Sequence, residues 1–349
     1  MLNTLINTAY SLLIDTILYI MAIAVIAGAF ASLLSEFGII QLLNKVLSPI
    51  MQPLYGMPGA AALGIVTTYL SDNPAILTLA DNIQYRRYFK AYQIPALTNL
   101  GTAFGMGLIV TTFMLGATGS WGSKAILATL CGNLGAVIGS IISTRLMLQF
   151  TAKAIGKQAN AFCGDTPMNN SPPKGASSRG WLRVMDALLD GGKKGVELGL
   201  NIIPGVLVIC TLVMMLTNGP SSTGYTGAAY EGIALLPLLA EKADCVLKPL
   251  FGFSNSSSIA VPVTALGSAG AALGMVPRLL AQNQLSCNDV AVFTAMCMCW
   301  SGYLSTHVSM MDVLKCSQFT GKAILSHTIG GLIAGVSAHW LFLALQCLL

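Results

Sequence analysis

The fold of this chain follows from one stretch, Thr67-Thr68-Tyr69-Leu70-Ser71-Asp72-Asn73-Pro74-Ala75-Ile76-Leu77. It lies in an apolar segment, residues 56–82, that breaks halfway, and each flank is far shorter than the ~20 apolar residues a spanning helix needs. Proline cannot donate the helical hydrogen bond and biases the residue before it away from the helical conformation, so the break leaves backbone groups and an aspartate unpaired. The stretch predicts a re-entrant helical hairpin whose tip faces protein or a polar cavity.

A second broken segment lies in the other half of the chain. Residues 253–277 carry Pro262-Val263-Thr264-Ala265-Leu266-Gly267-Ser268-Ala269-Gly270 at their middle. Interrupted apolar segments at corresponding positions of two halves point to a transporter's binding site. The polar side chains of the two predicted tips are therefore candidate substrate ligands: Ser71, Asp72, Asn73, Thr264 and Ser268.

The composition indicates a multi-pass protein of the cell (inner) membrane. Charged residues make up 9% of the 349 and hydrophobic residues 54%, whereas a soluble domain averages roughly a quarter charged residues. The net charge of +5 comes from basic residues clustered in short loops, where they report orientation. No basic face with interleaved aromatic residues is present, so the expected surroundings are a lipid bilayer and no nucleic acid. The nine cysteines are scattered singly, unlike a disulfide framework.

We expect an all-α integral membrane protein with six spanning helices around the two hairpins. The spans cover approximately residues 12–34, 92–115, 124–150, 196–216, 289–311 and 322–349. Glycines at 132, 135 and 139 predict a close helix contact. Amphipathic stretches at 36–55 and 230–250 are expected at the membrane interface. The hydrophilic segment 151–185 is interpreted as a cytoplasmic linker between two domains, 1–150 and 186–349.

The two domains match each other as repeats. Pro53-Leu54-Tyr55-Gly56 corresponds to Pro249-Leu250-Phe251-Gly252, 196 residues later, and residues 104–108 fall on 300–304 at the same offset. Three spans per half is an odd number, so the second copy must enter the membrane from the opposite side. With the linker in the cytoplasm, all of the 18 basic residues fall inside except Lys124, Lys242, Lys248 and Arg278. The sequence therefore predicts inverted repeats, with both termini external.

The repeat resembles the nucleoside-recognition, or Gate, module. The likeness is carried by Gly199-Leu200-Asn201-Ile202-Ile203-Pro204-Gly205, its partner around Gly28, the two broken segments, and the run from Cys297 to His307. The module is shared by concentrative nucleoside transporters, the membrane region of ferrous iron permeases, and spore maturation proteins A and B. In the transporters a polar-acidic-Ala-Pro tip holds the base and a Cys-Gly-Phe-Ala-Asn-Phe-Ser-Ser helix holds the ribose.

Two motifs of this chain resemble those of the transporters. Ser71-Asp72-Asn73-Pro74 is similar to the first motif, and residues 299–306 to the second, but the Gln-Thr-Glu triplet is missing and Ser301 or Gly302 replaces the asparagine. The resemblance implies a secondary transporter of a small polar organic solute, in the range of nucleosides and related metabolites. It would work by alternating access without a cofactor other than Na⁺ or H⁺ as coupling ion. Trimers of nucleoside transporters suggest a homo-oligomer.

Several candidate residues each have two interpretations. Asp72 either binds the coupling ion or caps a helix at the interface, since a carboxylate in mid-bilayer costs at least ~3 kcal/mol. The amides of Asn73 and Asn99 either ligate a coupling ion or bridge helices. The hydroxyls of Ser301, Ser305 and Thr306 either bind substrate or bond back to their own helix.

Two other function classes stay open. A divalent metal permease would need thiols or carboxylates that converge on the pathway, but Cys297 and Cys299 point about 200° apart on a helix. A non-transporting membrane component of the spore-maturation type would move no solute. An enzyme is not expected, because no nucleophile-base spacing, phosphate loop or metal motif is present.

Overall fold

The structure is a computed structural model that describes residues 1–37, 39–73, 75–76, 83–159, 180–205, 207–208, 211–221 and 224–347. Within these ranges the chain is mainly helical and has no strand, so the predicted all-α class is confirmed. Three predicted features lie outside the described residues: Pro74, most of the second limb of the first predicted hairpin, and most of the predicted linker.

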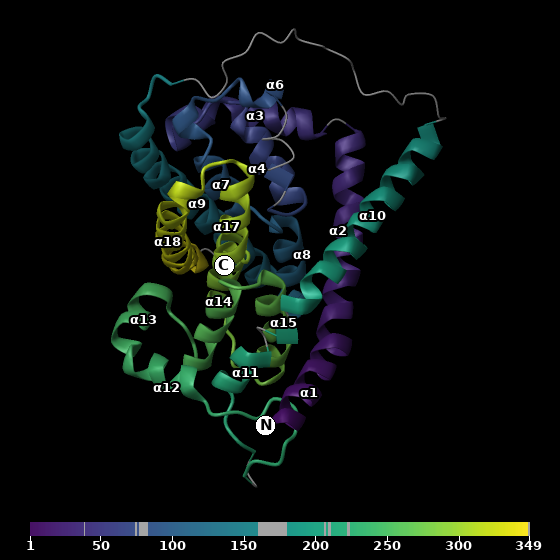
Figure 1. The fold of residues 1–349 in the computed structure, drawn as a ribbon. Helices are drawn as coiled ribbons and strands as arrows, with labels where there is room; N and C mark the ends of the chain where they lie inside the picture. Colours follow the sequence, from purple (N-terminus) through teal and green to yellow (C-terminus); the bar gives the residue numbers. More distant parts are fainter. Residues whose placement is uncertain are drawn as a thin grey trace.

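The first half runs from a long N-terminal helix to α9 (Figure 1). The N-terminal helix consists of α1 (Leu2–Ser11), a π-helical turn (Leu12–Ile17) and α2 (Leu18–Glu36). The remaining elements follow in chain order: α3 (Ile39–Tyr55), α4 (Ala61–Leu70), α6 (Ile83–Arg86), a 3₁₀ turn (Ala91–Gln93), α7 (Ala96–Thr102), α8 (Gly107–Ala117), a second 3₁₀ turn (Gly119–Trp121) and α9 (Ser123–Ile155).

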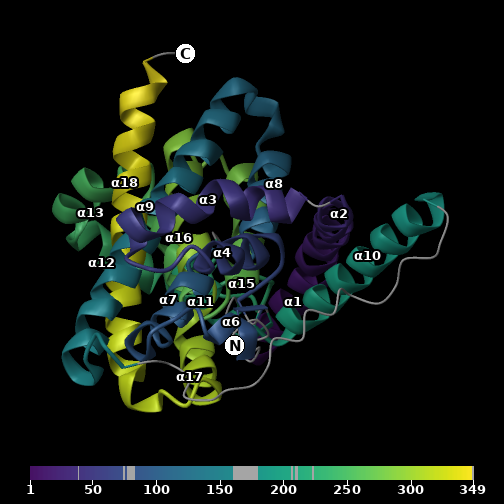
Figure 2. The same ribbon diagram turned by 90° about the horizontal axis from the view of Figure 1, so that it is seen from above.

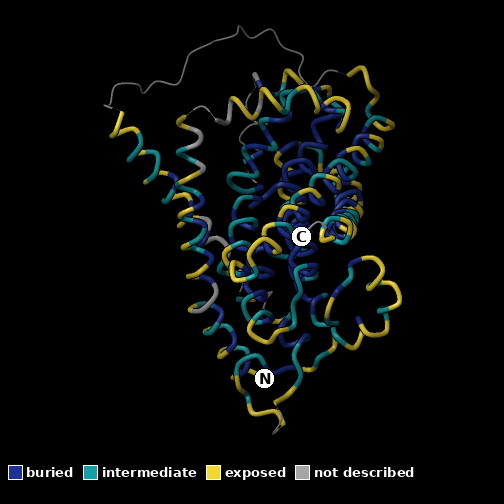
Figure 3. Tube along the Cα trace, turned by 180° about the vertical axis from the view of Figure 1, so that it is seen from behind, coloured by how far each residue is buried: buried dark blue, intermediate teal, exposed yellow. Residues whose placement is uncertain are grey.

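The second half has the same general order of elements. It comprises α10 (Gly180–Gly205), α11 (Thr211–Thr217), α12 (Leu235–Lys242), α13 (Asp244–Phe251), a 3₁₀ turn (Ser256–Ile259), α14 (Ala260–Ala265), α15 (Ala269–Ala281), α16 (Cys287–Trp300), α17 (Tyr303–Val313), a 3₁₀ turn (Ser317–Phe319) and α18 (Thr320–Gln346). Every residue of α16 from 288 to 300 is buried. Figure 3 shows the buried residues gathered in the middle of the molecule and the exposed ones on its outer helices.

The chain is a multi-pass membrane protein. Four helical segments among the described residues are long and apolar enough to cross a membrane: Leu2–Phe30, Ala91–Ala117, Ser123–Ile155 and Ser317–Gln346. The span predicted at 289–311 is not continuous, because α16 ends at Trp300 and α17 starts at Tyr303. The span predicted at 196–216 falls on α10, on α11 and on residues outside the described ranges.

Glycines let two helix pairs pack backbone to backbone. A Cβ on Gly139 of α9 would collide with the Gly330 carbonyl of α18, and Gly135 packs against Ala334 and Ala338, which confirms the predicted close contact. Gly28 of α2 and Gly191 of α10 meet in the same reciprocal way. Both pairs are antiparallel, since contacts advance along one helix as they retreat along the other. Figures 1 and 2 show the α2 and α10 pair standing to one side of the other helices.

The two halves place left-handed residues at matching positions. Gly56 (φ 70°) and Gly252 (φ 61°) lie 196 residues apart, as do Met106 (φ 56°) and Gly302 (φ 66°). The carbonyl of Gly56 accepts a hydrogen bond from Gln93 Nε2 at 3.1 Å, and that of Gly252 from Asn288 Nδ2 at 2.8 Å. The turn before each interrupted segment and the helix break after it are thus built alike.

Candidate functional site

Four interruptions of the helices meet in the interior. We name them the first tip (residues 71–73, after α4), the second tip (residues 266–268, between α14 and α15), the first break (residues 103–106, between α7 and α8) and the second break (residues 301–302, between α16 and α17). Helix ends leave backbone groups without intrahelical partners, so a place where several ends converge is polar even in an apolar protein. Their contacts with each other define the candidate site.

The first tip touches both breaks through Asn73. The Nδ2 of Asn73 donates a hydrogen bond of 2.7 Å to the Ser301 carbonyl in the second break. A carbonyl can only accept, so this bond also fixes which end of the Asn73 amide is nitrogen. The amide oxygen lies against Gly105 in the first break, where a Cβ would collide with it. Asn73 is 2% exposed, and it joins the two halves of the chain at the site.

Backbone hydrogen bonds join the second tip and the adjoining end of α14 to the second break and the start of α17. Gly302 N donates to the Ala265 carbonyl at 2.9 Å, and Leu304 N to the Leu266 carbonyl at 3.4 Å. At the tip, Ser268 caps α15 by accepting from Ala271 N at 3.2 Å. The second tip and the start of α17 are therefore held together as one body.

Two carboxamide oxygens at or near these interruptions have no hydrogen-bond partner among the described residues, those of Asn73 and Asn99. Both side chains are buried, Asn99 fully. Buried polar atoms are nearly always hydrogen-bonded, so each exception calls for a bound species or a functional reason. Both oxygens are hard, neutral ligands of the kind that Na⁺ prefers.

Asn99 also bridges helices. Its Nδ2 donates to Ser143 Oγ of α9 and to Ser326 Oγ of α18, each at 2.9 Å, and lies 3.1 Å from the Ala323 carbonyl. The bridging interpretation therefore describes its nitrogen, and the ion-binding interpretation concerns its oxygen. Only the oxygen is available for a ligand in this arrangement.

Asp72 lies in the first tip, directly before Asn73. Its Oδ1 accepts from Asn73 N at 2.7 Å, and the side chain is half-buried. No described cation makes an ion pair with this carboxylate. An unpaired carboxylate next to Asn73 can accept hydrogen bonds from a donor-rich solute or bind a cation.

Three of the predicted hydroxyl ligands bond within their own helix or turn. Ser71 Oγ donates to the Thr67 carbonyl at 2.6 Å, Thr264 Oγ1 to the Ala260 carbonyl at 2.7 Å, and Thr306 Oγ1 to the Gly302 carbonyl at 3.2 Å. Ser301 contributes its carbonyl to Asn73. The Ser305 side chain lies outside the described side chains. The structure thus places these residues at the interruptions but leaves few of their hydroxyls facing a ligand.

Sequence reasoning missed Gly105 as a site residue. Its lack of a side chain is what lets Asn73 approach the first break. The signal was present in the Gly101, Gly105 and Gly107 series, which predicts local unwinding but not which partner approaches.

The alternative of a divalent metal permease gains no support from the described residues. They contain no group of three or more His, Cys, Asp or Glu side chains that could hold a metal ion. Cys297 and Cys299 are buried, and Cys299 Sγ lies 3.6 Å from the Ala136 carbonyl.

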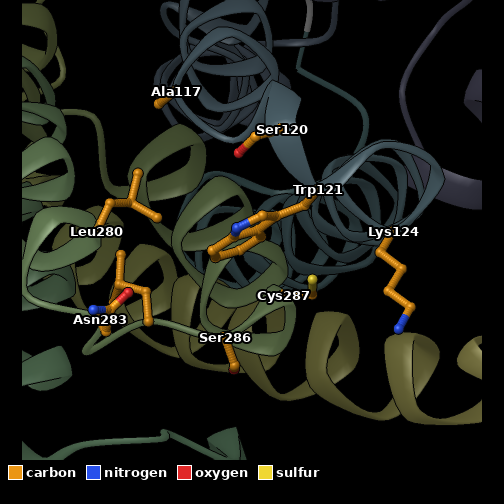
Figure 4. Close-up of a pocket in the computed structure, with 9 residues that line it drawn as sticks. Ala117, Ser120, Trp121, Lys124, Leu280, Asn283, Ser286 and Cys287 are labelled. Carbon is orange, nitrogen blue, oxygen red and sulfur yellow. The ribbon is translucent and has the colours of Figure 1, made fainter.

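A cleft of about 730 Å³ lies apart from the four interruptions, between the start of α9 and the connection from α15 to α16. Figure 4 shows Trp121 and Lys124 on one side and Asn283, Ser286 and Cys287 on the other. The two loops that form it are both external in the predicted topology, and the structure places them side by side.

Comparison with known proteins identifies the fold. No family model matches the sequence, and no curated protein matches it. Among solved structures, the chain is similar to CNTnw, a concentrative nucleoside transporter. A doubly substituted CNTnw in an outward-facing state gives a TM-score of 0.58 at 17% identity, over 95% of this chain and 75% of that chain. CNTnw in an inward-facing substrate-bound state gives 0.57 at 15% identity, over 93% and 75%. Across nearly its whole length, the chain therefore has the fold of a concentrative nucleoside transporter.

Proposed function

We propose that this protein is a secondary transporter that carries a small polar organic solute, of the nucleoside class or a related metabolite, by alternating access coupled to Na⁺ or H⁺. One observation carries the proposal: Asn73 in the first tip spans both helix breaks and keeps its amide oxygen unpaired in the interior. An unpaired amide oxygen and a carboxylate where helix ends meet are the features of a ligand-binding site and would serve no purpose in a protein without one.

The arrangement suits a polar solute. Helix ends carry partial charges, positive at N-termini and negative at C-termini, so interrupted helices offer donors and acceptors without a formal charge. Transporter sites in the membrane are commonly formed by such discontinuous helices. Asp72 and Asn73 would supply side-chain hydrogen bonds, and the carbonyls and amides of the two breaks would supply the rest.

The repeats are inverted and the two interrupted segments are re-entrant hairpins in this proposal. The matching left-handed residues and the antiparallel α9–α18 and α2–α10 pairs support it. By analogy with nucleoside transporters, α2, α10 and the amphipathic helices form a scaffold, and each interrupted segment moves with the helices that follow it.

Cysteine labelling tests the inverted topology. Ser120 and Ser317 are exposed, in loops 197 residues apart that the repeat makes equivalent. In a background without native cysteines, Ser120→Cys should react with an impermeant reagent from outside and Ser317→Cys only from inside. Labelling of both from one side contradicts inverted repeats.

A binding and uptake screen tests the function. Purified protein is first screened by thermal shift against nucleosides, nucleobases and related metabolites, with and without Na⁺, and hits are then tested for uptake into proteoliposomes. We expect at least one nucleoside-like solute to stabilise the protein and to accumulate when an ion gradient is applied. Uptake of Fe²⁺ alone would favour the permease alternative. No uptake of any solute, by folded protein, would favour a non-transporting component.

A further inference from the structure

Two buried imidazoles lie in contact next to the candidate site. His307 of α17 and His327 of α18 are 0% and 1% exposed, and their ring centroids are 4.6 Å apart at an angle of 47°. The ring of Tyr303, the first residue of α17, lies 5.4 Å from His307 and 5.1 Å from His327. Two of the three histidines of the chain are thus in one cluster, directly after the second break.

His327 is held in one neutral form by its neighbours. Its Nε2 lies 2.5 Å from the Cys299 carbonyl, which can only accept, so Nε2 carries the hydrogen. Its Nδ1 lies 2.9 Å from Ser143 Oγ and accepts from that hydroxyl. Ser143 in turn accepts from Asn99 Nδ2 at 2.9 Å. A directed chain of hydrogen bonds therefore runs from Asn99 to the Cys299 carbonyl, and both nitrogens of His327 are used.

The ring of His307, unlike that of His327, is not held by hydrogen bonds from the described residues. Neither of its ring nitrogens has a hydrogen-bond partner in the described part of the chain. The Tyr303 carbonyl, one turn earlier, interacts with the ring but does not meet hydrogen-bond geometry. An unpartnered imidazole in a sealed interior leaves a free lone pair for a proton and a free N–H.

Among the described residues, no charged side chain lies beside His307 to fix its protonation. Its own helix contributes Tyr303. The charged residues Asp312, near the end of α17, and Lys315, just beyond it, are exposed. Facing helix α18 contributes His327, which is itself bonded to the Cys299 carbonyl of α16. Helix α7 carries no titratable residue and presents Thr98 and Thr102 to Met311 and Met310.

We propose that His307, paired with His327, is the proton-binding site that couples H⁺ to transport. The proposal rests on the proposed function and names its coupling ion. Imidazole is the side chain that gains and loses a proton near neutral pH. The pair takes up one proton only, because both nitrogens of His327 are already bonded and two imidazolium rings in contact would repel each other.

The position of the pair explains how a proton would act on the site. Protonated His307 has two N–H donors that need acceptors, and the sealed arrangement offers none with good geometry. The charged ring therefore favours an arrangement in which water reaches α17, whereas the neutral ring favours the sealed one. Because α17 begins directly after the second break, a shift of α17 would move the Ser301 carbonyl that binds Asn73. The Tyr303 hydroxyl shares a hydrogen bond of 2.6 Å with Thr328 Oγ1, which connects the start of α17 to α18.

Histidine-selective NMR tests proton binding without any transport. In protein with ¹⁵N-labelled imidazoles in lipid nanodiscs, three ring systems are expected, assigned with His307→Gln and His339→Gln. We expect the His307 signals to shift from the neutral to the protonated form as the pH is lowered, while His327 keeps the Nε2–H tautomer. A His307 ring that stays neutral throughout, or a His327 ring that titrates in its place, overturns the proposal.

Uptake by matched variants then tests coupling. One unit of pH gradient can drive about tenfold accumulation if one proton moves with each solute. His307→Gln should bind solute as the wild type does but lose this accumulation. His339→Gln is the control, because His339 is also buried but pairs with Asn288 away from the cluster. A gradient response retained by His307→Gln contradicts the proton site and leaves the transporter proposal intact. Titration of His307 without any uptake contradicts the transporter proposal and leaves the proton site intact.

Discussion

The two tips approach similar helix breaks with different chemistry. The first tip brings side chains, the carboxylate of Asp72 and the amide of Asn73, and it reaches across to the other half of the chain. The second tip brings the Leu266 carbonyl, which with the adjoining Ala265 carbonyl of α14 bonds to residues 302 and 304 of its own half. The first tip thus offers side-chain groups, and the second tip makes backbone contacts within its own half.

The breaks differ in the same sense. Met106 adopts the left-handed conformation despite its side chain. Gly105 beside it has no Cβ, which leaves room for the Asn73 amide. Gly302 adopts the left-handed conformation without a side chain, and a Cβ there would lie 3.1 Å from the Gly267 carbonyl. Asn73 contacts both breaks, but a glycine holds the left-handed position only in the second.

The largest effect is expected at Asp72. Asp72→Asn is nearly isosteric and removes only the charge, so concentrative uptake should fall to the level of empty liposomes if the carboxylate serves the substrate or the coupling ion. Asparagine caps helices about as well as aspartate, so a capping role predicts normal uptake. Uptake with and without an ion gradient, at matched protein levels, separates the two. Normal gradient-driven accumulation would remove Asp72 from the site.

A smaller but selective effect is expected at the breaks. Gly105→Ala should displace Asn73 and weaken solute binding while the protein stays folded. Gly302→Ala should mainly lower stability, by about 1–2 kcal/mol, the cost of a left-handed alanine. Solute affinity and thermal unfolding of both variants provide the measurement. Equal loss of affinity in the two variants would show that the tips are not specialised.

The smallest effects are expected at the hydroxyls of the second half. Ser268→Ala removes the cap of α15 and should cost about 1 kcal/mol of stability, with little change in affinity. Thr306→Val removes a hydroxyl that bonds to the Gly302 carbonyl, and should change affinity less than the several-fold that a lost substrate hydrogen bond of roughly 1 kcal/mol would produce. Isothermal titration with a transported solute checks both. A tenfold or greater loss in either variant would make the second tip a ligand-binding element.

Local sequence patterns were sufficient for the class and for the positions of the two tips. Low charge and long apolar runs predicted a helical membrane protein, and the Ser71 to Pro74 turn predicted where the first segment stops, since α4 ends at Leu70. The break at Ser301 and Gly302 was not predicted, because the surrounding run is apolar and helix-compatible. It is stabilised by distant partners, the Ala265 carbonyl and the Asn73 amide.

The sequence by itself determined which residues are polar in an apolar chain, because the cost of placing Asp72, Asn73, Asn99 and His307 in a membrane is a property of each residue. Only the tertiary structure decided which of their atoms are used. The hydroxyls of Ser71, Thr264 and Thr306 donate hydrogen bonds to nearby carbonyls. The amide oxygens of Asn73 and Asn99 have no hydrogen-bond partner among the described residues. His307 and His327, 20 residues apart in the sequence, become a pair only because α17 folds back along α18. Such contacts depend on helix packing between distant segments, which no local pattern encodes.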